Sequence, residues 1–246
     1  MDRQTTNRPF TRDCPTARLR DYLPPMVSLL DIIGPVMVGP SSSHTAGACR
    51  IGLFARGMLG TTPDKALVEL HGSFARTGVG HGTDRAIAGG LLGYQPDDER
   101  LRGAVDDAAK QGVAVTFENT KLRGEHHPNT TRLTLEKGGK KVTVIGSSLG
   151  AGRIMITEID GYPVEISGSF PVLVIVAQDK PGMINAVTGA LAAEEVNIST
   201  MRVSRRQKGG DAIHIYELDA PASAAALEHV RALPAVKHAR AIDRVS

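Results

Sequence analysis

The sequence predicts an α+β protein built from two domains, and three observations lead to that class. Helix-like and strand-like segments occur in blocks instead of strict alternation. Residues 131–146 alternate in polarity on both sides of Gly138 and Gly139, which is typical of an antiparallel hairpin and not of a doubly wound parallel sheet. The chain of 246 residues is also long enough for two ordinary domains.

Changes in composition predict where the domains begin and end. Residues 1–25 are polar and aperiodic and contain Pro and Arg, so we interpret them as a flexible N-terminal extension. Ser and Gly between residues 165 and 170 precede a fresh apolar strand and indicate a linker. The expected domains are therefore 26–165, a mixed α/β unit, and 169–246.

The larger domain is expected to contain helices and strands in the following order. A helix starts near Thr45, because apolar residues and His44 recur at helical spacing up to Met58. Gly112 is predicted to cap the C-terminus of the helix at 98–112. The predicted segments are a strand or turn at 27–39, the helix from 45, a strand at 66–70, helices at 83–93 and 98–112, a strand at 113–118, the hairpin at 131–146 and a strand at 153–161.

The smaller domain gives a clearer pattern. A buried strand is followed by a loop with Asp179 and Pro181 that starts a helix, and Ile184, Val187 and Leu191 then repeat at helical spacing. The remaining segments complete the order βαββαβ, which is a ferredoxin-like arrangement. They are strands at 172–177, 196–206, 212–219 and 235–242, with a turn at 207–211 and a second helix at 221–233.

Composition excludes several classes of protein. With 41% hydrophobic and 22% charged residues, the chain has the balance of a soluble globular protein. Its longest apolar run, 172–177, is too short to span a membrane, and the N-terminus lacks the apolar core of a secretory signal. The net charge of +3 is spread along the chain. We therefore expect a cytoplasmic protein that binds neither nucleic acid nor membrane.

The cysteines limit the metal chemistry. The chain has two, Cys14 and Cys49, in unrelated contexts and without a Cys-x-x-Cys pair. An iron–sulfur cluster needs three or four thiolates, so this chain is not expected to hold one by itself. No lysine lies in or beside the Ser-rich or Gly-rich motifs, which argues against pyridoxal phosphate.

A polar stretch stands directly ahead of the first expected helix. Ser41, Ser42 and Ser43 are followed by His44 and Thr45. The first backbone N–H groups of a helix lack partners within the helix and favour an anion such as a carboxylate. One serine is enough to cap a helix, and three exceed that need. In a purely structural interpretation, these residues cap the helix and their hydroxyls face solvent. In a functional one, they form a carboxylate site in which His44 moves a proton.

Several separated motifs resemble known families. Residues 179–200, with an Asp-x-Pro-Gly loop and Asn197, resemble the ACT domain, a small regulatory domain that binds amino acids. Four motifs in family order, at 28–56, 71–87, 127–133 and 147–161, resemble the beta domain of iron–sulfur-dependent L-serine dehydratase, in the form that has separate alpha and beta chains. A related fold serves as a substrate-binding regulatory domain in some D-3-phosphoglycerate dehydrogenases.

The resemblance implies an enzyme subunit. It implies that the chain converts L-serine to pyruvate and ammonia together with an L-serine dehydratase alpha chain, that this partner ligates a 4Fe-4S cluster, and that the ACT domain forms homodimers, with L-serine as substrate or effector. The implied catalytic residues are His44 and His127. The implied substrate-binding residues are Ser41, Ser42, Ser43, Thr45, His81, Thr83, Asp84, Asn129 and Thr130. The implied effector-binding residues are Asp179, Pro181, Gly182, Met183, Asn197 and Ile198.

Two alternatives remain at the level of the sequence. The chain could be a non-catalytic amino-acid sensor that uses both domains only for binding. Residues 146–150 also fit the Gly-x-Ser-x-Gly pattern of hydrolases, but that motif must pass from a strand into a helix. Residues 153–159 continue with strand-like alternation, so a Gly-rich strand connection with no nucleophilic role for Ser148 is the better interpretation.

Overall fold

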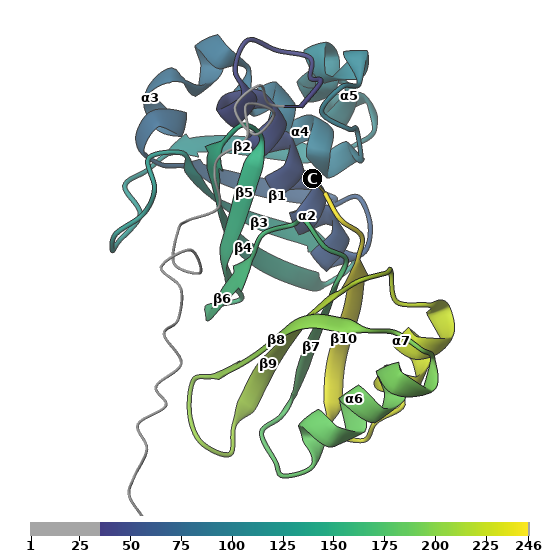
Figure 1. Ribbon diagram of the computed structural model, residues 1–246. Helices are drawn as coiled ribbons and strands as arrows, with labels where there is room; N and C mark the ends of the chain where they lie inside the picture. The colour runs from purple at the N-terminus through teal and green to yellow at the C-terminus, as the bar shows by residue number, and fades with distance from the viewer. Residues whose placement is uncertain (1–34, 246) are drawn as a thin grey trace, which may run out of the picture.

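Two β-sheets with helices on their outer faces make up the molecule (Figure 1). The computed structural model describes residues 35–245. The first sheet has six strands in the order β2-β1-β3-β4-β5-β6, in which β1 and β2 run parallel and the remaining pairs are antiparallel. This mixed topology confirms the α+β class. Its strands are β1 (Lys65–Leu70), β2 (Ala114–Asn119), β3 (Thr130–Lys137), β4 (Lys140–Gly150), β5 (Arg153–Ile159) and β6 (Tyr162–Ile166).

Helices cover one face of this sheet (Figure 1). Side chains alternate between the two faces of a strand, so Val68, Leu133 and Val144 all point to the helical side, where they are fully buried. The residues that alternate with them along each strand, such as Glu69, Arg132 and Thr143, point to the other face. The covering helices are α2 (Ala48–Leu59), α3 (Gly72–His81), α4 (Thr83–Leu92) and α5 (Ala104–Lys110).

The hairpin between β3 and β4 forms as predicted. Lys137 pairs with Lys140 across a two-residue turn, and Gly138 and Gly139 have φ of +54° and +77°. Both angles lie in the left-handed region, which glycine adopts without the steric cost that other residues carry. The helix predicted at 83–93 is also present as α4, and it ends at Gly93 with φ of +89°.

Other predictions need correction. The first helix begins three residues early, as a π-helical turn η2 (Ser42–Gly47), because the Ser41 hydroxyl caps it. The helix at 98–112 divides into a 3₁₀ turn η3 (Glu99–Gly103) and the shorter α5. Residues 35–39 form bends and no strand, and the rest of the predicted segment 27–39 lies outside the described residues, as does the extension 1–25. Helix α3 and strand β6 were not predicted.

The second sheet belongs to a βαββαβ unit, as predicted. Its order is β10-β7-β9-β8 and all its pairs are antiparallel. In its first helix Met183 takes the buried position together with Val187 and Leu191, whereas Ile184, which was expected there, is 43% exposed. The elements are β7 (Val172–Gln178), α6 (Met183–Ala193), β8 (Ile198–Arg205), β9 (Asp211–Leu218), α7 (Ala224–Arg231) and β10 (Val236–Ile242).

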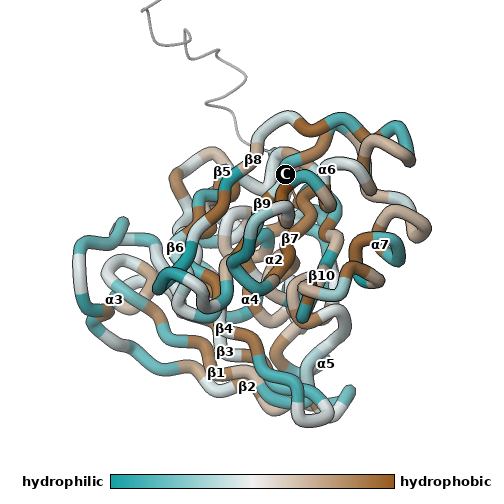
Figure 2. The backbone as a smooth tube through the Cα atoms, turned by 90° about the horizontal axis from the view of Figure 1, so that it is seen from below, coloured by the Kyte–Doolittle hydropathy of each residue, from teal (hydrophilic) through white to brown (hydrophobic). Residues whose placement is uncertain are grey.

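The second sheet is buried on both faces. Leu173, Ile175 and Tyr216 face α6 and α7, while Val174 and Ile215 face away from them and join the core of the larger domain. One of the two hydrophobic clusters is therefore shared by both units, whereas the other lies within the second unit, between its sheet and α6 and α7. The end of α2 contacts β10, and in the view of Figure 2 α2 overlaps with the second sheet. Within residues 35–245, no helix is long and apolar enough to cross a membrane.

Candidate active site

Four segments that are distant in the sequence meet at one end of the first sheet. They are residues 41–47, 71–77, 127–130 and 147–150. The Ser73 N–H donates to Pro128 O at 2.6 Å. Gly47 packs so closely on Ser148 that a Cβ atom at position 47 would lie 2.0 Å from the Ser148 hydroxyl. Only glycine fits there, and this contact holds the start of the first helix against the end of β4.

His44 lies at the centre of this cluster, on η2, and is only 8% exposed. Its Nδ1 is 3.4 Å from the Ser41 hydroxyl, which also accepts the His44 backbone N–H. Its Nε2 is 3.1 Å from the Thr77 hydroxyl and 3.4 Å from the Ser73 hydroxyl. The imidazole thus has a hydroxyl group at each nitrogen.

The hydrogen bonds around Thr77 assign the tautomer of His44. The single hydroxyl proton of Thr77 is donated to Ser73 O at 3.0 Å, one helical turn earlier. The oxygen of Thr77 is therefore an acceptor toward His44, and Nε2 carries the proton. In the neutral imidazole this leaves the lone pair on Nδ1, which faces Ser41. Nδ1 is the atom of this site that can accept a proton.

The environment of His44 favours its neutral form. Burial lowers the pKa of His44, and the nearby ring of His81 lowers it further, against a smaller opposing effect of a backbone hydrogen bond with Ser73. The two ring centroids are 4.8 Å apart, and His81 is held in place by a 2.9 Å contact between its Nδ1 and Thr77 O. His44 is therefore uncharged at neutral pH, as a general base must be.

Three further residues proposed for substrate binding lie beside His44 and His81. Thr45 is buried and its hydroxyl donates to His81 O at 3.5 Å. The Thr83 hydroxyl and one Asp84 carboxylate oxygen are buried and have no hydrogen-bond partner among the described residues. Next to them is a pocket of 230 Å³ lined by Val38, Gly39, Pro40, Thr45, His81, Gly82, Arg85, Ala86, Leu101 and Arg102. Ser42 and Ser43 are half-buried at the start of η2.

The second predicted catalytic histidine lies apart from the first. His127 is exposed, and its Nδ1 accepts the Asn129 N–H at 3.1 Å. The Thr130 hydroxyl is buried and contacts the Ser147 hydroxyl at 2.7 Å. Among the described residues, His127 makes no hydrogen bond or ring contact with His44. It lines a separate pocket of 300 Å³ with His126, Glu125 and residues of β4 and β5.

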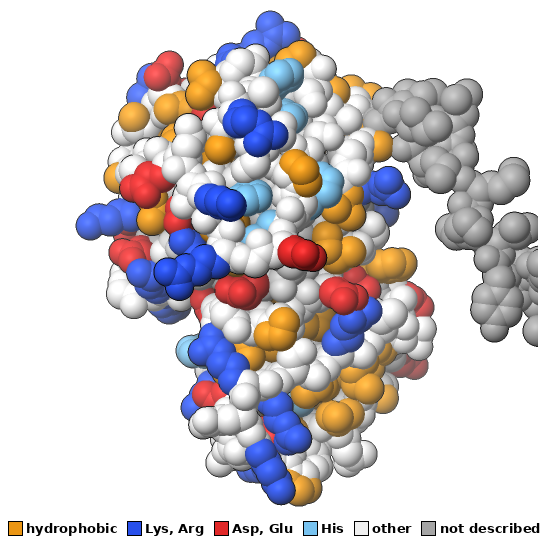
Figure 3. All heavy atoms as spheres, turned by 90° about the vertical axis from the view of Figure 1, so that its left-hand side faces the viewer, with side chains coloured by type: hydrophobic (Ala, Val, Ile, Leu, Met, Phe, Trp, Pro, Cys, Tyr) orange, Lys and Arg blue, Asp and Glu red, His pale blue; other side chains and the backbone are white. Residues whose placement is uncertain are grey.

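The surface over this region is rich in histidine. Figure 3 shows several histidine side chains gathered on the larger domain, with Lys and Arg side chains beside them. His71 and His126 pack edge to face with ring centroids 5.9 Å apart. Burial, followed by the charges of His126, Lys121 and Arg76, lowers the pKa of His71.

Sequence reasoning missed Ser73 and Thr77, the two hydroxyls that hold Nε2 of His44. Together with His81 they lie at positions i, i+4 and i+8, so they share one face of α3. That spacing was available in the sequence. It was overlooked because Gly72, Gly78 and the apolar-poor composition hid the helix itself.

The hydrolase-like motif is not a nucleophile elbow. Residues 146–150 lie in β4 and lead through a turn into β5, not into a helix. The Ser148 side chain is fully buried, and its hydroxyl, which is wedged against Gly47, has no partner in the described structure. The prediction that this motif leads into a strand instead of a helix is confirmed.

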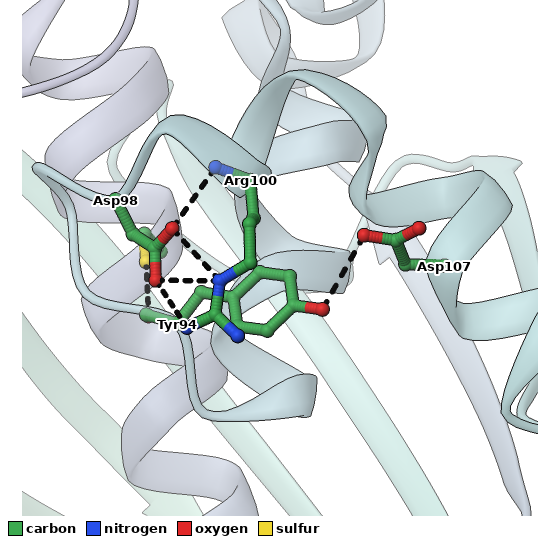
Figure 4. Close-up of polar contacts among 5 residues, drawn as sticks. Tyr94, Asp98, Arg100 and Asp107 are labelled. Carbon is green, nitrogen blue, oxygen red and sulfur yellow. Dashed lines mark hydrogen bonds and ion pairs between the residues drawn. The ribbon is translucent and has the colours of Figure 1, made fainter.

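Cys49 is not poised to bind metal. Burial raises the pKa of its thiol to about 12, and its Sγ donates to Tyr94 O at 3.2 Å. The Tyr94 segment is tied down locally: Arg100 stacks 4.1 Å above the Tyr94 ring and pairs with Asp98, and the Tyr94 hydroxyl donates to Asp107 (Figure 4). The thiol is a buried packing group.

The residues proposed for effector binding lie at the two opposite ends of the second sheet: Asp179, Pro181, Gly182 and Met183 surround the start of α6, whereas Asn197 and Ile198 lie at the start of β8, beside the end of β9. Asp179 accepts Arg205 Nη1 at 2.6 Å and the Gly209 N–H at 3.2 Å, and the bond with Arg205 is the main reason that the pKa of its carboxyl is lowered. Gly182 has φ of +85° and leaves the N-terminus of α6 without a side-chain cap. Asn197 is exposed and donates to Asp219 at 2.6 Å.

Those effector residues differ in accessibility. Pro181 and Gly182 are exposed, so the backbone of their loop is open to a ligand. Ile198 is half-buried, and Met183 is 5% exposed and belongs to the core beneath the helix. The loop backbone is open to a small molecule, Asn197 is exposed at the other end of the sheet, and the side chain of Met183 supports the helix.

The fold and the cluster around His44 define a protein that joins an α+β domain with a histidine–hydroxyl site to a βαββαβ unit. Comparison with known families agrees with that division. Residues 28–158 match the model of the serine dehydratase beta chain family, and residues 171–235 match that of the ACT domain. The chain belongs to the serine dehydratase beta chain family.

Individual relatives support the assignment. The chain is 41% identical to a probable L-serine dehydratase beta chain of Bacillus subtilis, over 84% of this chain and 94% of that protein. It is 36% identical to an L-serine dehydratase beta chain of Peptoniphilus asaccharolyticus, over 79% and 88%. A shorter match, 28% identical over 48% of this chain and 22% of the relative, is to a D-3-phosphoglycerate dehydrogenase of Methanocaldococcus jannaschii.

Proposed function

We propose that this chain is the beta subunit of an iron–sulfur-dependent L-serine dehydratase, which converts L-serine to pyruvate and ammonia in the cytoplasm. The observation that carries the proposal is the buried imidazole of His44, which favours its neutral form and directs its Nδ1 lone pair toward the Ser41 hydroxyl at the start of η2. The relatives named as L-serine dehydratase beta chains supply the reaction.

The reaction needs a base and a way to expel hydroxide. In the proposed step, Nδ1 of His44 takes the α-proton of L-serine, the Cα–H electron pair forms the Cα=Cβ bond, and the β-hydroxyl leaves. The resulting enamine rearranges to an imine, which water hydrolyses to pyruvate and ammonia. Because His44 begins neutral and then becomes an imidazolium, the Thr77 and Ser73 oxygens at Nε2 stabilise the charge that it gains.

The start of η2 is the proposed site for the substrate carboxylate. Ser42 and Ser43 are only half-buried there, and the first backbone N–H groups of the helix favour a negative charge. The Ser41 hydroxyl is already used by His44, so it orients the base and does not bind substrate freely. His81, Thr45 and Thr83 line the buried side of the same helix end.

The described residues do not fit a 4Fe-4S cluster. A cluster iron takes a thiolate, and the Cys49 thiol is buried, protonated and bonded to a carbonyl. We therefore propose that the cluster belongs to an alpha chain, and no step on this chain is derived through it. The beta-chain names of the relatives support a partner of this kind.

The ACT unit is proposed to form homodimers and to bind L-serine as an effector. Strand β8 is an outer strand of its sheet, and Met201 and Val203 on it are 46% and 41% exposed. Hydrophobic side chains also gather on this unit in Figure 3. The outer edge of β8 has no partner strand in its sheet and carries apolar side chains. Such an edge is suited to pair with a second copy, next to the open loop at Pro181 and Gly182.

The proposal is tested with the purified chain and a cluster-bearing partner. The chain alone, after anaerobic reconstitution with iron and sulfide, is expected to be colourless and inactive on L-serine. With the partner, His44→Ala should lower kcat/KM at least tenfold, which corresponds to about 1.4 kcal/mol, whereas a conservative Arg153→Lys on the exposed start of β5 should not change it. A cluster and turnover without a partner, or full activity of His44→Ala, would contradict the proposal.

A second candidate function is a non-catalytic amino-acid sensor. The match to part of a D-3-phosphoglycerate dehydrogenase favours it, since that match covers 119 residues but only 22% of the relative. The two functions differ in one result: a sensor binds L-serine but forms no pyruvate with any cluster-bearing partner.

A further inference from the structure

A pocket of 640 Å³ lies between the two domains, far along the chain from the cluster around His44. The end of α2, the hairpin turn between β3 and β4, and strand β10 surround it. This volume is in the range of small-molecule sites, which are often found at domain boundaries. Its lining comprises Met58, Leu59, Gly139, Lys140, Lys141, Val142, Ile159, Asp160, Tyr162, Val174, Val176, Ile213, Arg231, Val236, Lys237, His238, Ala239 and Arg240.

The inner wall of the pocket is aliphatic. Val142 comes from the first sheet, and Val174, Val176 and Ile213 come from the face of the second sheet that points toward it. Tyr162 and the imidazole of His238 are the two aromatic rings among the lining residues. Such a wall favours a branched or straight aliphatic group over an aromatic ring or a polar one.

The rim of the pocket is basic. Lys141, Arg231 and Lys237 each pair with a carboxylate, at Glu136, Glu228 and Asp211 respectively. The two remaining cations have no carboxylate partner within residues 35–245: the Lys140 side chain makes no hydrogen bond or ion pair, and the Arg240 side chain donates only to the carbonyl oxygens of Met58 and Ala239. The rim therefore holds two positive charges that an anion can neutralise.

One acidic residue lines the pocket. The Asp160 carboxylate accepts the Thr143 N–H at 2.7 Å, and burial raises the pKa of this group. Arg206 and His238 lie near enough to oppose that rise. The Asp160 carboxylate thus bonds to the backbone of Thr143 and interacts with Arg206 and His238. It does not neutralise the charges of Lys140 and Arg240.

We propose that this pocket binds a small aliphatic carboxylate without an ammonium group, with a body of about four to six carbons. The aliphatic body packs on Met58 and Val176, which are half-buried where they line the pocket, and the carboxylate pairs with Lys140 and Arg240. An amino acid is disfavoured, because its ammonium group would be placed among cations. The site is separate from the loop at 179–183 and Asn197, and it does not depend on the proposed catalytic role.

The test is calorimetric titration of the full chain with three ligands at up to millimolar concentration. 4-Methyl-2-oxopentanoate is expected to bind. Two control ligands are expected to bind at least tenfold more weakly. L-Leucine has the same carbon skeleton with an ammonium group in place of the oxo group, and pyruvate lacks the aliphatic body. Equal binding of L-leucine, or no heat with the branched oxo acid, would overturn the proposal.

Two variants locate the binding. Lys140→Gln, at an exposed turn, should weaken the binding of the branched oxo acid about tenfold. Lys121→Gln, at an exposed position outside the pocket lining, is the matched control and should leave that affinity unchanged. Val176→Phe should fill the pocket and abolish binding, while thermal unfolding checks that it is folded. Unchanged affinity in Lys140→Gln, or equal losses in Lys140→Gln and Lys121→Gln, would refute the assignment.

Discussion

His44 derives its chemistry from the residues around it. A histidine in water is half-protonated near pH 6.5, and here burial and the ring of His81 both lower the pKa of His44 below that value. The imidazole therefore favours its neutral form, which is the form that the proposed role as a general base requires. It loses that form only when the pH falls through its lowered pKa.

The pH dependence of activity follows from this direction. In the complex with the partner, the midpoint of the acid limb of kcat/KM should lie below pH 6.5, the midpoint expected for an unperturbed histidine. His81→Gln removes one of the two causes, so the pKa of His44 should rise and the acid limb should move to higher pH. Rate profiles of both proteins between pH 5 and 8 measure this. An acid limb that stays in place in His81→Gln would show that another group controls it.

Thr77 is a positioning residue for His44. Thr77→Val removes the acceptor at Nε2 and leaves only the longer contact with Ser73, so the proton can move to Nδ1, which would disable the base. We expect a decrease in kcat of at least threefold with little change in KM, about 0.7 kcal/mol or more. Thr77→Ser should restore the rate, and a purely steric role would not be rescued in this way.

At the scale of elements, the contact between α2 and α4 depends on glycine. A Cβ atom on Gly90 would lie 2.2 Å from Cys49 O, and one on Gly52 would lie 2.7 Å from Ile87 O. The two helices therefore approach with backbone against backbone. A methyl group at either position must push them apart.

This contact gives a prediction with a matched control. Gly90→Ala should destabilise the protein by about 1–3 kcal/mol, since overpacking displaces a helix that carries part of the core. In α3, a Cβ atom on Gly80 would have no neighbour within 4 Å apart from its chain neighbours and the backbone of its own helix. Gly80→Ala should therefore stabilise the protein by about 0.5–1 kcal/mol, since alanine restricts the unfolded chain. Urea unfolding of both variants measures the difference. Equal effects at the two positions would show that the close approach is unimportant.

The elements that sequence reasoning predicted are those with a strong local period. The hairpin at 131–146, the helix at 83–93 and the whole βαββαβ unit carry alternating or helical patterns that survive without tertiary context. Helix α3 was missed because its sequence contains glycines and few apolar residues, and β6 because its five residues depend on pairing with β5.

The site was predicted in part for the same reason. The stretch from Ser41 to Thr45 is dense enough to be noticed in one dimension, and the structure places it at a helix start. Ser73 and Thr77 reach His44 only through α3, so their role required the helix to be known. The separation of His127 from His44 depends on long-range packing and has no local sequence pattern.

At the scale of the whole molecule, the two domains share one of the two hydrophobic clusters. Gly57 of α2 packs on Ile242 of β10, and Val174 and Ile215 of the second sheet belong to the cluster formed by the larger domain. The smaller domain alone would expose this apolar face to water, so its isolated behaviour would not represent the intact chain.

The shared core predicts cooperative unfolding. Amide hydrogen exchange of the full chain should give similar opening free energies for buried amides of β3–β4 and of β7–β9, within about 1 kcal/mol. Urea should lower both together. Exchange through two separate openings, with the smaller domain opening first and alone, would contradict a single cooperative unit.

One continuous helical rod joins the two functional regions. The six residues of η2 and the twelve of α2 run from His44 at one end to the contacts with Ile242 and Arg240 at the other. Such a rod is about 25 Å long at the usual rise per residue, and it resists compression because each turn is bonded to the next. The backbone path from β10 to the imidazole of His44 therefore runs through helix alone and contains no loop.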